Sequence, residues 1–374
     1  MIAGGGTGGH VYLGVALARE LQRRNSASDF LFVGTRRGLE ARIVPQESFR
    51  VEFIESAGLK RVGRLESVRN FLLIPQSLLQ ARRLIRRFAP DIVVGVGGYS
   101  SGPVVLAAWW LGKPTLIVEP NAYPGLANRL LAPFIDCAAL ALPDAGRFFG
   151  KKAEVTGIPV REEFLRLPQR VRHAGELCLL IYGGSQGSRA LNSIVCAALF
   201  DLKQLGPGLH LIHQTGEKAL EEVRRAYHEA GVEGEVQAFF PRIFQQFGEA
   251  DLLLARAGAS TVAEVTAAGK AAILVPFPGA TDDHQTRNAR ALEQHGAAKV
   301  IPESQWQPGL LARELRYYME RAGEVERMQE AARRLAKPEA TRRIADLIEQ
   351  LAAGNRQPAV RRGQMAGGSR ESHV

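Results

Sequence analysis

The stretch AGGGTGGHVYLGVALARELQRR, residues 3–24, sets five glycines in the six positions from Gly4 to Gly9 and follows them with a histidine. Beyond the glycines, Leu17 and Leu21 lie on one helical face and charged residues lie elsewhere, which predicts an amphipathic helix. A glycine loop that leads into a helix offers N–H groups and the positive end of the helix dipole, which favour a phosphate. The stretch therefore predicts the first loop of a doubly wound α/β sheet.

This loop also fits a dinucleotide-binding fold, because Gly4, Gly6 and Gly9 satisfy the pattern G-x-G-x-x-G. Such a fold expects a ribose-binding acid after its second strand, whereas the segment DFLFVGTRR ends in Arg36 and Arg37. Two arginines there would suit the 2′-phosphate of NADP. An NADP-dependent oxidoreductase is therefore one alternative, although it leaves a second glycine loop in the other half of the chain unexplained.

Length and composition narrow the class of protein. The chain has 374 residues, of which 46% are apolar, enough for two domains. Its three cysteines match no metal-binding spacing, and their odd number argues against a disulfide framework, so we expect a reducing cytoplasm. No basic segment followed by an apolar one opens the sequence, so we expect no signal peptide.

The uncharged stretch at residues 92–112 is long enough to span a bilayer. Glycines and a proline interrupt it near its middle. Because such residues break a continuous helix, we predict a buried strand, a glycine loop and a buried helix instead of a transmembrane span.

The formal net charge of +10 is unevenly distributed. Residues 60–87 hold eight basic residues against one acidic residue, whereas residues 353–374 form a Gly-, Arg- and Ser-rich tail that we expect to be disordered. The charge alone suggests a nucleic-acid-binding protein. We do not favour that alternative, because the sequence shows no recognisable module that interleaves basic and aromatic residues.

Apolar, strand-like runs alternate with helix-like segments through most of the chain. Several runs are rich in Val, Ile and Leu without alternation, as parallel strands buried on both faces are. The alternation predicts βαβ units and parallel sheets in both halves, joined by a polar linker at residues 157–176. Strands are expected at residues 29–35, 50–55, 92–96, 115–118, 138–142, 153–156, 177–182, 209–213, 235–239, 251–255, 272–276 and 298–301.

Four motifs, in chain order, carry a family resemblance: GGGTGGH, GVGGYSSGP, GGSQGSRALN and RAGASTVAE. They resemble the MurG family, the UDP-N-acetylglucosamine:lipid I N-acetylglucosaminyltransferases of bacterial peptidoglycan synthesis. The resemblance runs from about residue 2 to about residue 350. It implies a GT-B fold, in which two Rossmann-like doubly wound parallel-sheet domains face each other across a cleft.

The resemblance also implies a division of labour along the chain. The acceptor and the membrane would lie on the domain at residues 1–160, and the UDP-sugar donor on the domain at residues 161–325. A C-terminal helix at residues 326–352 is expected to pack back on the first domain. Family members usually carry several more residues before the first loop, whereas only Met1, Ile2 and Ala3 precede it here.

Residues that match the family's UDP-GlcNAc-binding pattern come from both halves. Phe240 stands where the family commonly has an isoleucine beside the uracil, a contact expected to be mostly backbone. Pro120 replaces a usual glutamine, which puts details of the acceptor side in doubt. The matching positions are Thr7, Gly8, Gly9, Asn121, Arg161, Ser185, Phe240, Ala259, Ser260, Thr261, Glu264 and Gln285.

The implied reaction makes sense of these residue types. The C4 hydroxyl of N-acetylmuramic acid in lipid I attacks the anomeric carbon, and UDP leaves with inversion. Arg161 and loop N–H groups suit the diphosphate, and Glu264 suits the ribose hydroxyls, although it also fits a helix cap. His10 is the candidate base, or else a plain hydrogen-bonding group. The sequence has no Asp-x-Asp motif, so we expect no protein-held metal and no cofactor.

A lipid-linked acceptor would require work at a bilayer surface. Residues 71–88 combine apolar and basic side chains, as helices that lie in an anionic membrane interface do. We therefore expect a peripheral enzyme on the cytoplasmic face of the bacterial inner membrane. A UDP-sugar epimerase of the same fold is the main alternative, since it would share the donor contacts. The expected membrane-facing residues are Leu78, Leu79, Arg82, Arg83, Ile85 and Arg86.

Overall fold

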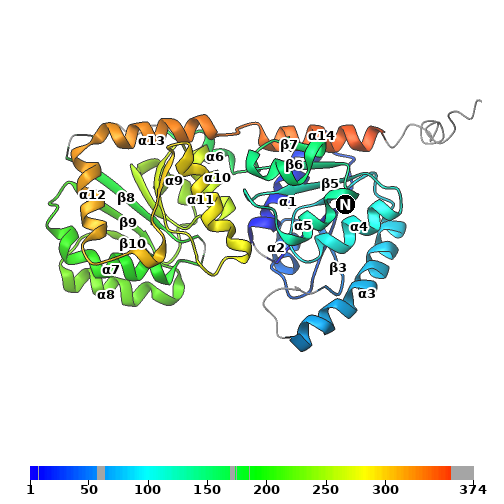
Figure 1. Cartoon of the computed structure of the whole chain (residues 1–374), viewed down its shortest axis with the longest axis horizontal. Helices are drawn as coiled ribbons and strands as arrows, with labels where there is room; N and C mark the ends of the chain where they lie inside the picture. Colours follow the sequence, from blue (N-terminus) through cyan, green and yellow to red (C-terminus); the bar gives the residue numbers. More distant parts are fainter. Residues whose placement is uncertain (7, 57–63, 169–172, 174, 185, 355–374) are drawn as a thin grey trace, which may run out of the picture.

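The computed structural model describes residues 1–6, 8–56, 64–168, 173, 175–184 and 186–354. Two parallel sheets lie side by side along the long axis of the molecule (Figure 1). Each of the expected strand-like runs overlaps a strand of the structure. The GT-B arrangement of two doubly wound domains is therefore confirmed, and residues 355–374 of the predicted tail lie outside the described part of the chain.

The first sheet has the strand order β3-β2-β1-β4-β5-β6-β7, with every neighbouring pair parallel. Its strands are β1 (Ile2–Ala3), β2 (Leu31–Gly34), β3 (Arg50–Phe53), β4 (Val93–Gly95), β5 (Thr115–Glu119), β6 (Cys137–Leu140) and β7 (Ala153–Val155). Its helices are α1 (Gly8–Arg24), α2 (Glu40–Gln46), α3 (Arg64–Phe88), α4 (Ser101–Trp110) and α5 (Leu126–Leu131).

The second sheet repeats the pattern in the order β10-β9-β8-β11-β12-β13, again parallel throughout. Its strands are β8 (Leu177–Tyr182), β9 (Leu209–Gln214), β10 (Glu235–Gln237), β11 (Leu252–Ala255), β12 (Ala271–Leu274) and β13 (Ala298–Val300). Its helices are α6 (Glu162–Leu165), α7 (Arg189–Lys203), α8 (Leu220–Ala230), α9 (Ile243–Glu249), α10 (Ala259–Ala267), α11 (His284–Gln294) and α12 (Leu310–Glu320).

Helices cover both faces of each sheet, which is why the central strands are apolar at every position. In β8 the side chains of Leu179 and Leu180 are both fully buried, and they belong to separate core clusters on opposite faces. Successive residues of a strand point to opposite faces, so a strand covered twice needs apolar residues at every position.

Two C-terminal helices correct the prediction of a single helix at residues 326–352. The first, α13 (Ala322–Leu335), buries Val325 and Ala332 in the cores of the second domain. The second, α14 (Ala340–Gly354), runs along the top of the first domain in the view of Figure 1 and buries Ile344 and Ile348 in that domain. The packing back on the first domain is therefore made by α14 alone, because a short non-helical turn separates the two helices.

The stretch at residues 92–112 forms β4, a glycine loop and α4, as the sequence predicts. Within the described residues, none of the helices is both long and apolar enough to cross a bilayer. In each sheet the strand order reverses next to the first strand, between β1 and β4 and between β8 and β11. Ligands of doubly wound folds bind beyond the carboxyl ends of strands at such points.

Candidate functional site

The first glycine loop is occupied by a carboxylate of the protein itself. Glu40, at the start of α2, is 2% exposed. Its Oε2 accepts the N–H of Gly6 at 2.7 Å, and its Oε1 accepts the N–H of Thr35 at 2.8 Å. The Arg36 guanidinium stacks 5.2 Å from the ring centre of Phe53. These contacts engage the loop and the arginine that an NADP site would need, so the geometry disfavours the oxidoreductase alternative.

His10 lies in the first turn of α1, half-buried, with its Nδ1 3.3 Å from the carbonyl oxygen of Gly5. A carbonyl only accepts, so Nδ1 carries the proton and Nε2 carries the lone pair. Burial lowers the pKa of His10 below its ordinary value, while the hydrogen bond to Gly5 opposes that shift. A neutral imidazole with a basic Nε2 suits proton abstraction from a hydroxyl.

The first turn of α1 meets α10 of the other domain. A Cβ at Gly9 would stand 2.8 Å from the Ser260 Oγ. Ala259, Ser260 and Thr261 form the first turn of α10, whose N-cap residue, Gly258, has no side chain to bond the N–H groups of that turn. Predicted donor residues from both domains therefore come together at a helix N-terminus, where anions are favoured.

Glu264 lies one turn further along α10. Burial raises the pKa of its carboxyl to about 7, while the Arg161 guanidinium and a hydrogen bond from Tyr182 oppose that rise. Its Oε2 is buried without a hydrogen-bond partner. The Arg161 guanidinium also lies 5.0 Å from the ring centre of Phe164. A buried carboxylate with one oxygen unused is suited to accept ligand hydroxyls.

The second glycine loop, between β8 and α7, depends on tight backbone packing. Gly187 has a φ of 69°, and a Cβ there would stand 2.0 Å from the Thr215 carbonyl oxygen. Ser188 caps α7 by accepting the Leu191 N–H at 3.4 Å. The predicted residue Ser185 lies in this loop, and Thr7 in the first loop. Both lie outside the described residues.

Phe240 and Gln285 both make hydrogen bonds within the protein. The Phe240 N–H donates to Gln214 Oε1 at 3.0 Å, so that backbone group is already bonded within the protein. Gln285 Oε1 accepts the Ala257 N–H at 3.3 Å and the Phe277 N–H at 3.0 Å. Gln285 therefore braces the loops that follow β11 and β12.

Asn121 lies at the boundary between the domains rather than within the donor domain. Its Nδ2 donates to Glu119 at 3.0 Å, and its Oδ1 accepts from the Nδ2 of Asn288 on α11 at 3.2 Å. Asn288 also accepts the Ala122 N–H at 2.9 Å and is fully buried. Asn288 and Glu119 were not among the predicted site residues, although Asn288 follows the predicted Gln285 by three positions and Glu119 precedes the predicted Asn121 by two.

The predicted membrane-facing residues on α3 do not share one face. Ile85 is 1% exposed and packs in the core of the first domain, so its assignment to the surface was wrong. Leu78 packs against the same core, whereas Leu79 is exposed. The basic residues Arg83 and Arg86 are exposed, and Arg82 is half-buried.

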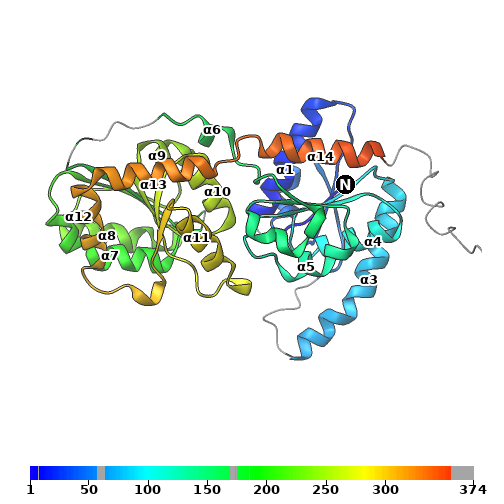
Figure 2. The ribbon, with the colours of Figure 1, turned by 45° about the horizontal axis from the view of Figure 1, so that its top comes forward.

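Two adjacent tryptophans at the end of α4 were missed, although the pair is visible in the sequence. Trp109 is 47% exposed and Trp110 is 71% exposed. The Arg82 guanidinium lies 5.9 Å from the ring centre of Trp110, so these aromatic side chains adjoin the basic side of α3. Figure 2 shows α3 extending from the first domain with α4 beside it.

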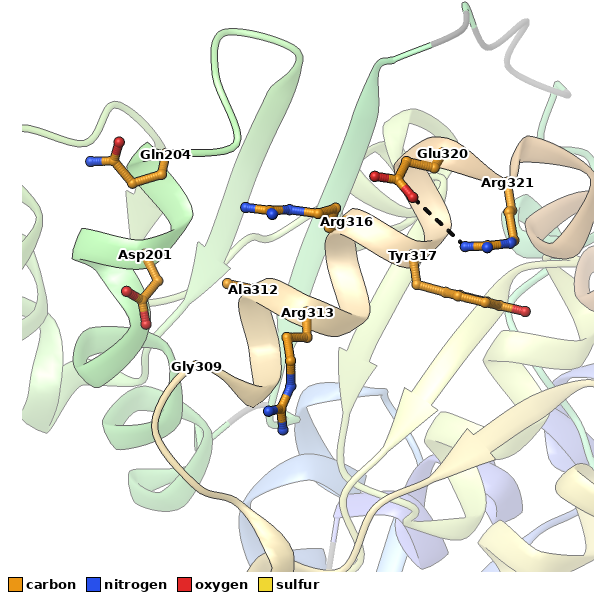
Figure 3. Close-up of a pocket in the computed structure, with 9 residues that line it drawn as sticks. All are labelled: Asp201, Gln204, Gly309, Ala312, Arg313, Arg316, Tyr317, Glu320 and Arg321. Carbon is orange, nitrogen blue, oxygen red and sulfur yellow. Dashed lines mark ion pairs between the residues drawn. The ribbon is translucent and has the colours of Figure 1, made fainter.

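A pocket of the structure lies elsewhere, on the second domain between α7 and α12 (Figure 3). It has a volume of about 440 Å³ and is lined by charged residues, among them Asp201, Arg313 and Arg316. The described members of the predicted site do not line it. In the part of the chain that the structure describes, no group of three His, Cys, Asp or Glu side chains could hold a metal ion.

Comparison with known families agrees with this geometry. Residues 1–140 match the Glycosyltransferase family 28 N-terminal domain, and residues 178–351 match the Glycosyltransferase family 28 C-terminal domain. Each match contains one complete strand-order reversal, so the two matched segments correspond to the two sheets.

Two relatives that match this chain over most of their length have the same protein name. The chain is 46% identical over 354 residues to the UDP-N-acetylglucosamine--N-acetylmuramyl-(pentapeptide) pyrophosphoryl-undecaprenol N-acetylglucosamine transferase of Anaeromyxobacter sp. (strain Fw109-5), which covers 94% of this chain and 93% of that protein. It is 42% identical over 353 residues to the protein of the same name from Myxococcus xanthus (strain DK1622), with 94% and 92% covered.

Solved structures support the same family assignment. A crystal structure of Acinetobacter baumannii MurG matches with a TM-score of 0.79 at 33% identity, over 94% of this chain and 98% of that one. A putative UDP-N-acetylglucosamine 2-epimerase from Listeria monocytogenes matches with a TM-score of 0.66 at 14% identity, over 93% and 95% of the two chains, which shows a shared fold alone. With nearly full-length relatives at 42% and 46% identity and both family 28 domains in order, the chain belongs to the MurG family of glycosyltransferases.

Proposed function

We propose that the chain is an inverting glycosyltransferase that moves GlcNAc from UDP-GlcNAc to the C4 hydroxyl of MurNAc in lipid I, giving lipid II. The observation that carries this proposal is the near-complete alignment, at 46% identity, with a transferase of that name. The contact of Gly9 with Ser260 supports it, because a group-transfer site needs the acceptor side and the donor side within reach of each other.

The acceptor side would centre on His10. Its Nε2 takes the proton from the C4 hydroxyl while that oxygen forms a bond to the anomeric carbon of GlcNAc. The bond between the anomeric carbon and the diphosphate oxygen breaks, and both its electrons leave with UDP. Loss of a general base of this kind typically slows a reaction about 10²–10⁴-fold.

The donor side would stabilise the charge that develops on UDP. The first-turn N–H groups of α10 and the loop before α7 offer preorganised donors, and such donors act without reorganising as charge develops. Arg161 adds a positive charge near Glu264. Glu264 would accept the ribose hydroxyls, and Gln285 would contact GlcNAc.

The membrane side would be the outer surface of α3 and α4. Leu79, Trp109 and Trp110 are exposed there, and Arg82 stacks on Trp110. Aromatic rings favour the level of the lipid headgroups, and each nearby basic residue contributes about 1 kcal/mol on an anionic surface. We infer peripheral binding at the cytoplasmic face of the bacterial membrane, where lipid II synthesis would serve wall growth, cell shape and division.

The decisive experiment mixes the full chain with lipid I and radiolabelled UDP-GlcNAc. We expect label to move to the lipid, with the new glycosidic bond in the β configuration by NMR. Omitting lipid I tests the epimerase alternative, since an epimerase would convert the nucleotide sugar without any acceptor. Conversion of the nucleotide sugar with no label in the lipid would overturn the proposal.

A further inference from the structure

The glycine-rich start of the chain packs around the carboxylate of Glu40. A Cβ at Gly5 would stand 2.1 Å from the Glu40 side chain, one at Gly34 would stand 2.3 Å from it, and one at Gly38 would stand 2.0 Å from it. Three glycines, one after β1, one at the end of β2 and one in the turn between β2 and α2, therefore leave the space that the Glu40 carboxylate fills. Among the described residues, no cation pairs with this carboxylate, and backbone and hydroxyl donors hold it instead.

One peptide group connects this carboxylate to His10. The N–H of Gly6 donates to Glu40 Oε2 at 2.7 Å. The C=O of Gly5 belongs to the same peptide group and accepts from His10 Nδ1, 3.3 Å away. The three groups form a chain in which the carboxylate bonds the peptide N–H and the peptide oxygen bonds the imidazole.

This chain has a chemical consequence. A peptide group whose N–H donates to an anion becomes a stronger acceptor at its oxygen, since bonds in a chain polarise one another. A stronger acceptor holds the proton on Nδ1 and leaves Nε2 as the basic nitrogen. The arrangement resembles the orienting carboxylate of a Ser-His-Asp triad, with a peptide group placed between acid and imidazole.

We propose that Glu40 is a positioning residue for His10, acting through the Gly5–Gly6 peptide group. The inference rests on the proposed role of His10 as the base. Two charges act on His10: the Glu40 carboxylate raises the pKa of His10, and His284 at the start of α11 lowers it. Removing the Glu40 charge therefore makes His10 less basic and weakens the preference of its proton for Nδ1.

The test measures turnover against pH for the full chain and for Glu40→Gln, together with the NMR titration of the His10 ring nitrogens. We expect kcat to fall and the KM for UDP-GlcNAc to stay unchanged. We also expect the acid limb of the kcat profile and the His10 titration to move to lower pH together, by about 0.5 unit or more. The matched control is Glu47→Gln, which removes a carboxylate just after α2 that pairs with Arg19 on the surface.

A merely structural role of Glu40 would lower stability and leave both midpoints where they are, and that result overturns the proposal. If Glu40→Gln does not fold, Glu40→Asp replaces it. Aspartate keeps the charge but is one methylene shorter, so we expect lower kcat and a His10 midpoint near that of the wild type. Two other failures are distinct. If the proposed function fails, the wild-type chain moves no label to lipid I, and if His10 is not the base, His10→Ala turns over normally. In both cases the NMR midpoint still reports whether Glu40 acts on His10.

Discussion

Gly9 of α1 and Ser260 of α10 face each other across the boundary between the two domains, so close that a Cβ at residue 9 would lie 2.8 Å from the Ser260 Oγ. Gly9 is helical, so its lack of a side chain serves this approach rather than an unusual backbone conformation. The glycine lets the first turn of α1 reach the helix that carries Glu264.

Replacing Gly9 by alanine tests this approach. Alanine favours a helix by about 1 kcal/mol, so the melting temperature should not fall. The Ser260 hydroxyl must turn away from the new methyl group, and losing one hydrogen bond to the donor raises the KM for UDP-GlcNAc about 2- to 12-fold. Gly323→Ala is the matched control, because Gly323 is helical in α13 and a Cβ there meets no atom within 4 Å. An unchanged KM in Gly9→Ala would refute the contact.

Glu264 should make donor binding depend on pH. Its pKa of about 7 means that the carboxyl is partly protonated near neutrality. Ribose hydroxyls donate to the ionised form and so lower that pKa, which releases a proton on binding. Affinity for UDP-GlcNAc should therefore rise with pH through about 7.

Calorimetry at pH 7 in two buffers of different ionisation enthalpy measures this proton release. Glu264→Gln should abolish both the release and the pH dependence. It should also weaken binding by about 1.5–3 kcal/mol, since it loses a charged acceptor. Proton uptake instead of release would contradict the ribose assignment.

The sheets could be predicted from the sequence because a strand covered on both faces must be apolar at every position. That constraint is local, so runs such as residues 177–182 are recognisable without the fold. The predicted donor-binding residues came only from the family resemblance of their motifs. Their relation across the domain boundary, for example Gly9 to Ser260, depends on how two distant segments pack.

The environment of Glu40 could not be predicted from the sequence, whereas the burial of Ile85 could have been. Glu40 is held by glycines and backbone groups up to 35 residues away, and no residue type marks that environment. Leu78, Ala81 and Ile85, by contrast, lie on one helical face at a spacing of i, i+3 and i+7. That face packs on the core of the first domain. The prediction erred by counting apolar residues near the arginines without separating the two faces.

His10→Ala should separate chemistry from binding. Turnover should fall about 10²–10⁴-fold, because the acceptor hydroxyl loses its base. The dissociation constant for UDP-GlcNAc should stay near the wild-type value, since the proposed donor contacts lie on other residues. Rapid-quench kinetics with saturating lipid I give the chemical step directly, and an unaltered rate would remove His10 from the mechanism.

Asn288 should couple the two domains. It accepts the Ala122 N–H and donates to the Ala257 carbonyl, so Asn288→Ala leaves a buried N–H without its acceptor, at a cost of about 1–3 kcal/mol. We expect denaturant unfolding to separate into two transitions as the domains lose this link. Gln294→Ala, on the exposed side of the same helix, should leave the single transition of the wild type. A single, unshifted transition in Asn288→Ala would show that other contacts hold the domains.

Membrane binding should depend on where the positive charge lies, not on its total. Replacing Arg82, Arg83, Arg86 and Arg87 by glutamine removes four charges from α3, beside the exposed Trp110. Each basic residue near an anionic surface contributes about 1 kcal/mol, so sedimentation with phosphatidylglycerol vesicles at low salt should fall sharply.

The matched control removes the same net charge from the second domain, by replacing the exposed residues Arg313, Arg316, Arg321 and Arg334 with glutamine. Because Arg313, Arg316 and Arg321 line the pocket of Figure 3, on the other domain, we expect vesicle binding to persist. Trp110→Ser should weaken vesicle binding without any change of charge, since the ring is proposed to enter the headgroup region. All these variants should keep their activity on a short-chain soluble acceptor, which needs no bilayer. Equal loss of vesicle binding in both arginine variants would mean that net charge alone attracts the protein, and the α3–α4 surface would then have no special role.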